Sequence, residues 1–554
     1  MMTPVDCNVI QQEEALCSRK DGTPLTNFAF GPIRPLAQPR HPQTLSAAQV
    51  TVRHLGGEFS LLVDLRHPNL MEQILQALPT CRLLQPSWRT ALDAYLIQAC
   101  RQAQTTGPVG LYFREHGLCR LSGGQWVFVC GDQVLGLPEG TRCQVSPQAA
   151  CARLAWDPNL DPVQATQQLY RRLSGADHIL LPIWAFTLLG SLRSCVRQLD
   201  VTTLPSLAIL GGQNLGKTTA AQRYMLLFDD ARRPGHFQAQ LDARSTAAST
   251  IDQVSQYRDQ VVLVDDLAKS ASSAQQRQRL DLIAEVLRFA SNDTEQVRMT
   301  PRRKPEKRTC QAGLAFTGEF YLDNPSDLTR LFVVELREPL SGGDAHDRTL
   351  AATVFRHWMV WLLPRLDEEL ELLGQSLVPL SSGQHPRLRK NRMVLLWALR
   401  TFYTFAQEVG ALSTPCIQQA MVRAAQVLDF HLEHQLRRLG RLTSSAPQGN
   451  LCWYILQGYS RNTFPIVSRK KLRREEECLV EDGALCIRTQ VLLDYLHQSC
   501  PSLHLTSKEM NRHLAREMGL DRPTKEARWA CKKIHGRRDL ALPLELLRRS
   551  AKKY

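Results

Sequence analysis

The stretch that decides the fold is Ile209-Leu-Gly-Gly-Gln-Asn-Leu-Gly-Lys-Thr-Thr219, which carries the complete phosphate-loop pattern Gly211-x-x-x-x-Gly216-Lys217-Thr218. The apolar run 206–210 predicts a strand before it, and residues 219–228 predict a helix after it. Strand, glycine loop and helix are the context that this motif requires, because loop N–H groups and the helix start then close on phosphates. The pattern predicts a nucleoside triphosphate site made of Gly211, Gly212, Gln213, Asn214, Leu215, Gly216, Lys217, Thr218 and Thr219.

Two side chains of this loop have predicted chemical roles. We expect the Lys217 ammonium to reach the β and γ phosphates, and the Thr218 hydroxyl to hold Mg²⁺. ATP and Mg²⁺ are therefore the expected cofactors. A glycine turn that arose by chance is the alternative, and the match of loop, strand and helix together disfavours it.

Length and charge limit the class of protein. A chain of 554 residues is too long for one core, so three or four domains are expected. A charged fraction of 22% is that of an ordinary globular protein. The net charge of +15 favours an acidic partner, and for a nucleotide-binding protein nucleic acid is the first candidate.

Cysteine usage and hydropathy indicate a cytoplasmic protein without a membrane partner. The 16 cysteines include no Cys-x-x-Cys pair, which argues against a zinc ribbon or a thioredoxin site and suits buried thiols in a reducing compartment. No basic start followed by an apolar run marks the N-terminus for secretion. The most apolar stretch, 179–192, is short and contains Pro182 and Gly190, so it predicts a buried helix.

An acidic strand follows about 50 residues after the phosphate loop. Val261-Val-Leu-Val-Asp265-Asp266 is an apolar run that ends in two carboxylates, and we expect it to lie beside the strand that carries the loop. Asp265 is assigned to the metal and Asp266 to the attacking water. The alternative is an apolar strand followed by an acidic turn.

Two further positions are candidates for γ-phosphate chemistry. The run Gly313-Leu-Ala-Phe-Thr317-Gly318-Glu319 predicts a strand whose Thr317 can sense the γ-phosphate or orient water, unless it is only a strand before a tight turn. Arg330 opens the next predicted strand, and an arginine at a subunit edge can act in trans on a neighbour's γ-phosphate. A surface salt bridge is the competing interpretation of Arg330.

A basic segment lies between the acidic strand and the Thr317 strand. Its prolines predict a projecting loop or hairpin, and its charges suit contact with a phosphodiester backbone, although many charge runs are only solvated faces. The predicted DNA contacts are Arg298, Arg302, Arg303, Lys304, Lys307 and Arg308.

The C-terminal region offers a second DNA candidate. Thr506 and Glu509 form a capping box, and Gly519 ends the predicted helix. With helix 489–499 before it and the basic stretch 532–542 after it, this helix suggests a winged helix-turn-helix. An ordinary amphipathic surface helix would have the same spacing. The expected DNA contacts are Lys508, Arg512 and Arg516.

The fold class expected is α/β, a P-loop ATPase core of the ASCE/AAA+ type with additions at both ends. Strands at 49–53 and 58–64, helices at 69–78 and 88–104, and a small antiparallel sheet over 110–130 predict an α+β N-terminal region. Long helical patterns at 349–373, 386–410 and 415–439 predict a lid. The expected divisions are a flexible arm 1–45, an α+β domain 46–160, the ATPase core 161–340, a helical lid 341–442 and a winged-helix-like basic domain 451–554.

The core resembles the helicase-like ATPases of mobile genetic elements, which are cassette, phage and plasmid replication proteins related to superfamily 3 and MCM-type AAA+ helicases. Gly-Gly-Gln-Asn-Leu-Gly-Lys-Thr-Thr, Val-Val-Leu-Val-Asp-Asp, Phe-Thr-Gly-Glu and Leu-Thr-Arg-Leu carry the resemblance, which covers about residues 110–440. Asp266 stands where many relatives have Glu, and Thr317 where Asn is more usual. The resemblance implies that Asp265 and Asp266 form the hydrolytic pair, Arg330 the finger, and segment 298–308 a DNA-touching hairpin.

The favoured prediction is an ATP-driven DNA motor, a replicative helicase that works as a homo-oligomeric, hexameric ring on single-stranded or forked DNA, with a primase or replication initiator as a further partner. The alternative is a regulator or loading switch in which nucleotide state controls DNA binding without unwinding. A non-catalytic nucleotide-dependent scaffold is a third hypothesis, weakened by the presence of both Asp265 and Asp266.

Overall fold

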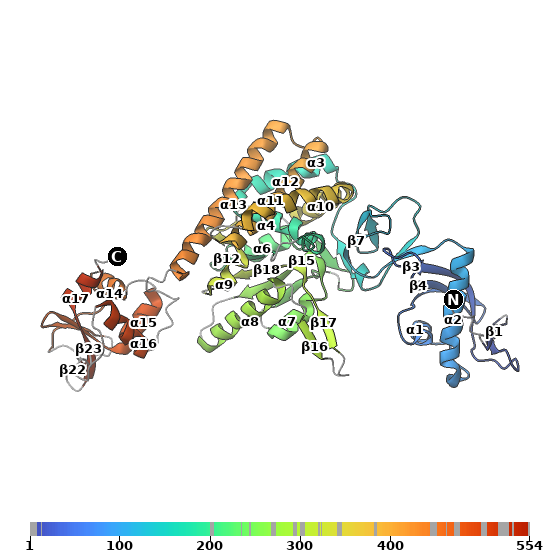
Figure 1. Cartoon of the computed structure of the whole chain (residues 1–554), viewed down its shortest axis with the longest axis horizontal. Helices are drawn as coiled ribbons and strands as arrows, with labels where there is room; N and C mark the ends of the chain where they lie inside the picture. Colours follow the sequence, from blue (N-terminus) through green and yellow to red (C-terminus); the bar gives the residue numbers. More distant parts are fainter. Residues whose placement is uncertain are drawn as a thin grey trace. The chain divides into compact units, whose positions relative to one another are not determined.

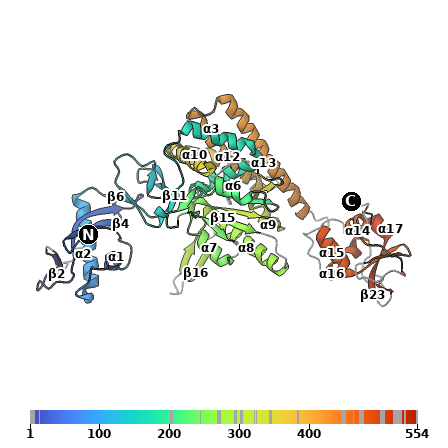
Figure 2. The ribbon, with the colours of Figure 1, turned by 180° about the vertical axis from the view of Figure 1, so that it is seen from behind.

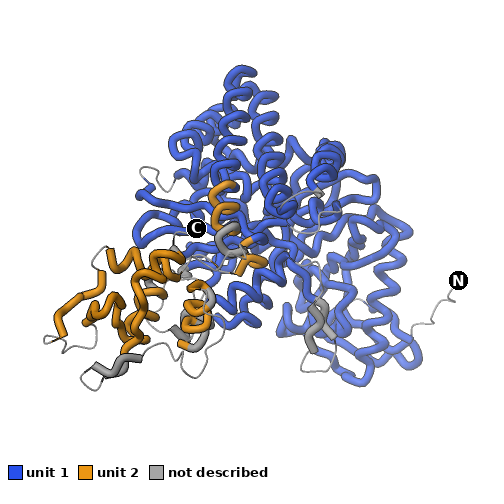
Figure 3. Tube along the Cα trace, turned by 60° about the vertical axis from the view of Figure 1, so that its left-hand side comes forward, with its two compact units in different colours: residues 1–321, 329–432 blue, residues 322–328, 433–554 orange. Residues whose placement is uncertain are grey.

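The computed structural model describes two compact units, residues 1–321 with 329–432 and residues 322–328 with 433–554 (Figure 3). The residues described are 8–12, 14–199, 204–233, 235–242, 245–267, 273–291, 296–299, 305–319, 322, 324–340, 346–381, 385–443, 451–460, 463–469, 477–499, 507–518, 531–534 and 537–551. Each unit is considered by itself below.

A five-stranded parallel sheet forms the centre of the first unit. Its order is β14 (Gln240–Asp242), β15 (Arg258–Leu267), β18 (Gln311–Gly318), β12 (Ser206–Gly211) and β19 (Leu331–Leu336). Figure 1 shows helix α4 (Asp177–Ser191) on one side of the sheet and α7 (Ala247–Val254) and α8 (Ser273–Ser291) on the other. The expectation of a mixed α/β fold is confirmed, and because all four strand pairs are parallel, the carboxyl ends of the five strands lie at one edge of the sheet.

The position of the acidic strand differs from the expectation. β15 does not lie beside β12, because β18 is inserted between them and pairs in parallel with both. The sequence does not reveal this, since all three strands are apolar runs buried on both faces and nothing in such a run fixes its neighbours. The consequence is that Thr317, on β18, lies between the loop strand and the acidic strand.

Helix α4 is the buried helix expected from the apolar stretch 179–192, and residues 179–191 are all buried. It packs against the sheet at close range, since a Cβ added at Gly313 would lie 2.9 Å from the Cα of Gly190. Pro182 is accommodated inside this helix. Among the described residues, no helix has the length and apolar content to cross a membrane.

Further helices cover the same side of the sheet. They are α3 (Pro162–Gly175), α5 (Arg193–Val196), α6 (Lys217–Tyr224), α10 (His346–Leu362), α11 (Leu366–Leu377), α12 (Pro386–Glu408) and α13 (Thr414–Thr443), the last of which continues into the second unit. The helices expected at 386–410 and 415–439 are thus present, whereas the single helix expected at 349–373 is divided into α10 and α11 by the 3₁₀ turn η3 (Leu363–Arg365), which contains Pro364. The helix after the phosphate loop ends at Tyr224, earlier than expected, and Phe228 belongs to strand β13 (Phe228–Asp230).

The structure of the N-terminal region contradicts the expected flexible arm over residues 1–45. Strands β1 (Val9–Gln11), β2 (Leu16–Ser18) and β3 (Ala29–Ala37) lie there, and β3 is the central strand of the sheet β10-β6-β3-β4-β5. Phe28 and Leu36 are almost fully buried, so a few apolar side chains outweigh the proline content. Pro32 is tolerated because it falls where the β3–β4 register shifts, between Phe30 and Ile33.

The other expected N-terminal elements are largely present. Strands β4 (Leu45–His54) and β5 (Gly57–Asp64) and helices α1 (Leu70–Ala77) and α2 (Arg89–Thr106) match the expected ranges. Strands β7 (Gly117–Arg120), β8 (Trp126–Cys130) and β9 (Gln133–Leu135) form the small antiparallel sheet. However, β6 (Gly110–Phe113) is not part of it and pairs in parallel with β3 and with β10 (Cys143–Val145).

The second unit combines helices with one antiparallel sheet. Helix α14 (Leu451–Ser460) is followed by strands β20 (Leu479–Glu481), β21 (Ala484–Ile487), β22 (Cys531–Ile534) and β23 (Arg537–Pro543), in the order β20-β21-β23-β22. Helices α15 (Thr489–Ser499), α16 (Ser507–Glu517) and α17 (Leu544–Ala551) complete it. The Glu517 carboxylate accepts the backbone N–H groups of Leu451 and Cys452, both at 3.0 Å, and so ties α16 to the start of α14.

Candidate functional site

The phosphate loop has the backbone conformation that its residue types allow. Asn214 has a φ of 59° and Gly216 a φ of 87°, both left-handed, which asparagine and glycine tolerate best. A Cβ at position 211 would lie 2.5 Å from the carbonyl oxygen of Leu336, so only glycine fits there. Gly216 occupies the N-cap of α6, and the helix therefore begins directly at Lys217. The loop thus places the N-terminus of α6 at the edge of the sheet where the carboxyl ends of the strands lie.

Lys217 lies over the loop itself. Its Nζ donates to the carbonyl oxygen of Gly211 at 3.0 Å and also to that of Gly212. The ammonium is therefore held in the concave side of the loop, next to the backbone groups that the pattern assigns to phosphate. This is the position from which the predicted contact with the β and γ phosphates would be made.

Asp265 is the centre of a cluster of polar side chains at the same edge. The Thr218 hydroxyl donates to Asp265 Oδ1 at 2.8 Å, and the Thr317 hydroxyl donates to the same oxygen. Gln240 Nε2 donates to Oδ2 at 3.0 Å. Three strands, β14, β15 and β18, and the start of α6 thus meet at one carboxylate, because the carboxyl ends of parallel strands share an edge.

The chemistry of this cluster fits Mg²⁺. Thr218 and Asp265 present a hydroxyl and a carboxylate, which are hard oxygen donors. Among the described residues no group of three or more His, Cys, Asp or Glu side chains could enclose a metal. Mg²⁺ is commonly held by one or two protein oxygens, with water and substrate phosphates completing the octahedron. Thr218 and Asp265 are therefore the residues that would hold the ion, and Thr317 fixes the carboxylate orientation.

Asp266 lies in β15, but its side chain is outside the part of the chain that the structure describes. Its assignment to the attacking water stays a prediction. Thr317, in contrast, is 1% exposed and its hydroxyl contacts Asp265 directly. Its direct bond to the Asp265 carboxylate makes a role in orienting Asp265 better supported than direct contact with a γ-phosphate.

Arg330 lies at the opposite edge of the sheet from this cluster. Its carbonyl oxygen accepts the N–H of Ser206 at 2.9 Å, at the start of β12, whereas the phosphate loop follows the end of β12. The two edges are about 16 Å apart along the strands. The structure therefore does not bring Arg330 to the Asp265 cluster of its own chain. Such a separation is what action in trans requires.

Arg330 has a second arginine as neighbour. Burial and the Arg330 charge together lower the pKa of Arg387, whose Nη1 lies 3.3 Å from the Thr329 hydroxyl. Both guanidinium groups belong to the first unit, and both are half-buried. Two cations that interact electrostatically raise the local positive potential at this edge of the sheet. Sequence reasoning found Arg330 but not Arg387, because they are 57 residues apart and meet only in the fold.

The basic segment forms the expected hairpin. Strands β16 (Gln296–Met299) and β17 (Pro305–Arg308) pair antiparallel, and Figure 2 shows them beside α7. Arg308 forms an ion pair with Asp252 of α7, so it fixes the base of the hairpin. Arg302, Arg303 and Lys304 lie outside the described residues, as do the side chains of Arg298 and Lys307. Their assignment to DNA stays a prediction.

The C-terminal helix has the expected amphipathic face. Met510, Leu514 and Met518 are buried, and Arg512 is exposed on the other side. The side chains of Lys508 and Arg516 lie outside the described residues, as do Thr506 and Gly519. Only Arg512 of the three expected DNA contacts is therefore placed on the surface.

A cavity beside the phosphate loop was not anticipated from the sequence. It has a volume of about 300 Å³, includes Gly216 and Thr219 in its lining, and receives Arg171 and Arg172 from α3 and Arg223 from α6. Arg172 is also held 3.3 Å from Asp347 of α10. The adjacent Arg171-Arg172 pair was the available signal, but α3 ends 36 residues before Gly211, and only the packing of α3 on α4 and α10 brings the pair there.

The chain matches no protein-family model, and no curated protein matches it. The solved structure of the active helicase SCCmec type IV Cch is similar in fold, with a TM-score of 0.50 at 13% identity over 99% of this chain and 100% of that one. Two other solved structures are weakly similar. The inhibitor-bound JCV helicase has a TM-score of 0.22 at 10% identity, covering 49% of this chain and 74% of that one. The apo NrS-1 C-terminal region has a TM-score of 0.24 at 9% identity, covering 75% and 92%. The similarities to the JCV helicase and the NrS-1 region are too weak to show a shared fold. The similarity to SCCmec type IV Cch shows a helicase-like fold.

Proposed function

We propose that this protein is an ATP-dependent DNA motor, a replicative helicase of a mobile genetic element that works as a homo-oligomeric, hexameric ring. The single observation that carries the proposal is the contact of Thr218 and Thr317 with one oxygen of Asp265, directly beside the phosphate loop. This arrangement suits a Mg²⁺–triphosphate substrate, because a hydroxyl and a carboxylate beside the loop are the kind of oxygen donors that Mg²⁺ takes. The fold similarity to an active helicase supports the choice of motor, as does the sequence resemblance to the ASCE/AAA+ class.

Hydrolysis in such a site is a matter of position and charge. Lys217 and the loop N–H groups hold the phosphates, Thr218 and Asp265 hold Mg²⁺, and Asp266 orients the water. Arg330 of one subunit acts on the γ-phosphate of the next. Its distance from the Asp265 cluster of its own chain is compatible with a ring, in which a second subunit would bring Arg330 to that cluster.

Asp265→Asn is expected to lower ATP turnover by about 10²-fold or more, because the metal loses its charged ligand. Thr317→Val keeps the side-chain shape but removes one bond to the carboxylate, so we expect a loss of about tenfold. Turnover at increasing Mg²⁺ concentration is the measurement. The Thr317→Val loss should shrink at high Mg²⁺, and full turnover by Asp265→Asn at any Mg²⁺ concentration would contradict the assignment.

We propose that the β16–β17 hairpin binds single-stranded DNA. Replacing Arg302, Arg303 and Lys304 by glutamine is expected to reduce the salt dependence of DNA affinity, with the slope of log K against log salt lower by about 2. Fluorescence anisotropy of a labelled oligonucleotide at several salt concentrations measures this slope. The matched control replaces three arginines of the first unit that pair with carboxylates elsewhere, Arg53, Arg120 and Arg365. An equal change of slope in this control would remove the hairpin from the proposed DNA path.

The second candidate is a nucleotide-controlled DNA-binding switch without unwinding, with the second unit as the DNA contact. The exposed Arg512 on the α15–α16 pair, followed by the β22–β23 hairpin, favours it, since helix, helix and hairpin are the parts of a winged helix. ATP turnover with and without single-stranded DNA, together with a fork-unwinding assay, separates the two. Strand separation supports the motor, whereas slow DNA-independent turnover without it supports the switch.

A further inference from the structure

Two glutamine side chains connect the helix after the phosphate loop to the Asp265 carboxylate. Gln222 of α6 donates from Nε2 to Oε1 of Gln240 at 3.2 Å, and Gln240 of β14 donates from Nε2 to Asp265 Oδ2 at 3.0 Å. All three side chains are partly buried and belong to the first unit. This chain of hydrogen bonds ends on Oδ2, whereas the Thr218 and Thr317 hydroxyls donate to Oδ1.

The spacing of residues along α6 and β14 brings these groups together. Thr218 and Gln222 are four residues apart on one helix, so both lie on the face of α6 that contacts the acidic strand. β14 pairs in parallel with β15, with Gln240 opposite Leu263. Side chains two positions apart share one face of a sheet, so Gln240 lies on the same face as Asp265, one step back along the strand. The contact therefore depends on β14 being the neighbour of β15, which the sequence does not reveal.

The chemistry of the acceptor fixes the direction of both amides. An ionised carboxylate accepts hydrogen bonds and donates none, so the NH₂ group of Gln240 is the part of its amide that faces Asp265. The Gln240 oxygen then faces Gln222, which must present its own NH₂ group. Turning either amide over would place two acceptors against each other. Each glutamine therefore has one favourable orientation, and Gln222 holds Gln240 in the orientation that serves the carboxylate.

The donors around Asp265 orient its carboxylate without neutralising it. Among the described residues, its side-chain donors are the Thr218 and Thr317 hydroxyls and the Gln240 amide, none of which carries a charge. An arginine or lysine partner would cancel much of the negative charge, whereas neutral donors leave it for a cation. Removal of such hydrogen bonds from a metal-binding side chain typically weakens metal binding by about 10–100-fold.

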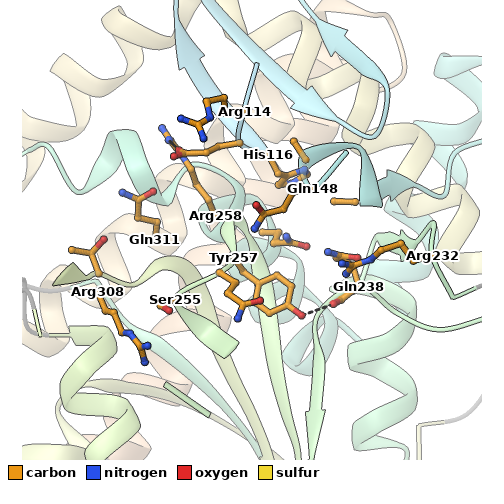
Figure 4. Close-up of a pocket in the computed structure, with 16 residues that line it drawn as sticks. Arg114, His116, Gln148, Arg232, Gln238, Ser255, Tyr257, Arg258, Arg308 and Gln311 are labelled. Carbon is orange, nitrogen blue, oxygen red and sulfur yellow. Dashed lines mark hydrogen bonds and ion pairs between the residues drawn. The ribbon is translucent and has the colours of Figure 1, made fainter. Parts of the chain in front are cut away.

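The β14 strand is held in place without this chain of amides. The backbone N–H of Leu263 donates to the carbonyl oxygen of Ala239 at 2.9 Å, and the Tyr257 hydroxyl donates to the carbonyl oxygen of Gln238 at 2.8 Å (Figure 4). These bonds join β14 and the residues directly before it to β15. The side chain of Gln240 is thus not needed to fix the strand, which favours a role in orienting Asp265.

We propose that Gln240 and Gln222 are positioning residues of the Mg²⁺ site, with Gln240 holding the Asp265 carboxylate and Gln222 holding Gln240. This inference rests on the proposed function, in which Thr218 and Asp265 hold the ion. A carboxylate turns readily about the bond that attaches it, and Gln240 opposes that rotation at Oδ2 while the hydroxyls oppose it at Oδ1. Loss of the amide should therefore lower metal affinity, while nucleotide affinity without metal stays the same.

Gln240→Met in the full-length chain is expected to weaken metal binding about tenfold, because methionine has a similar length but cannot donate. Mn²⁺, which takes the same oxygen ligands, is titrated into the ADP-bound protein and followed by electron paramagnetic resonance, so that the readout requires no turnover. Calorimetric titration of ADP is the second measurement. Its affinity in EDTA should be unchanged, and the gain in affinity on adding Mg²⁺ should fall.

The matched control is Tyr257→Phe, which removes a hydrogen bond that holds the start of β14 and leaves Gln240 in place. This variant should bind Mn²⁺ as tightly as the unsubstituted protein does, whatever its effect on the midpoint of thermal unfolding. If Gln240→Met and Tyr257→Phe have the same Mn²⁺ affinity, the proposal is overturned.

Gln222→Met tests the second step of the chain. It should weaken Mn²⁺ binding by only about threefold, because Gln240 keeps its own bond to Asp265. In the Gln240→Met background the same substitution should have no further effect, since Gln222 acts only through Gln240. An equal loss in both backgrounds would show that Gln222 acts in another way and would refute the chain.

Failure of this inference and failure of the proposed function give different results. If the unsubstituted protein binds ADP no more tightly with Mg²⁺ than with EDTA, the Mg²⁺ site itself is refuted. If the unsubstituted protein gains affinity from Mg²⁺ and Gln240→Met gains as much, only the positioning role is refuted. A protein that does not separate DNA strands would refute the motor and leave the result of the metal titration unchanged.

Discussion

Lys217→Ala is expected to lower ATP turnover by on the order of 10³-fold, while affinity for single-stranded DNA stays within about twofold. The reason is the position of Nζ, which lies over the loop in contact with the Gly211 carbonyl oxygen. No backbone group can replace a cation at that point as charge develops on the transferring phosphoryl group. Steady-state phosphate release and anisotropy of a labelled oligonucleotide measure the two quantities on one preparation.

The control for Lys217 is a substitution that removes the same charge at a distance. Arg53→Gln changes an exposed ion pair with Glu58 on the β4–β5 hairpin and should leave turnover unchanged. Unchanged turnover in Lys217→Ala would refute the phosphate-loop assignment. A parallel collapse of DNA affinity would indicate a misfolded protein, which the thermal unfolding midpoint would detect.

Arg330→Ala is expected to lower turnover by about 10³-fold or more, the usual effect of an arginine finger. The structure gives a sharper test than the single variant. Because Arg330 and the Asp265 cluster lie at opposite edges of the sheet, each active site of a ring would combine groups from two subunits. Mixing Arg330→Ala with Lys217→Ala should then restore turnover, since about one interface in four pairs an intact loop with an intact arginine.

Restoration on mixing separates action in trans from a structural role. Arg330→Lys keeps the charge but not the planar fork, and we expect it to recover little. The proposal of an active site shared between two subunits is refuted if the mixture of Arg330→Ala and Lys217→Ala is as inactive as each variant alone, while both variants unfold at the same temperature as the unsubstituted protein. If Arg330→Ala alone retains full turnover, Arg330 is a structural residue of the β19 edge.

Much of the local structure followed from the sequence because it depends on neighbouring residues. The phosphate loop needs glycines where φ is positive and a helix start at Lys217, and both conditions are local. The long helices α12 and α13, and helix α15 of the second unit, were predicted from the spacing of apolar residues. Their observed bounds match the expected ones closely. The prediction of a flexible arm over residues 1–45 was wrong, because composition does not show which few apolar side chains, such as Phe28, are buried in a core.

The sequence by itself determined the conformation of the phosphate loop and the presence of the acidic strand, since a motif of adjacent residues encodes its own geometry. Only the tertiary structure decided that β18 separates β12 from β15, that Thr317 shares an oxygen of Asp265 with Thr218, and that Arg330 is remote from both. It also decided that Gln222 and Gln240 connect α6 to the same carboxylate. Strand order and such chains of side-chain bonds depend on contacts between residues distant in sequence, and no local pattern specifies which apolar strand pairs with which.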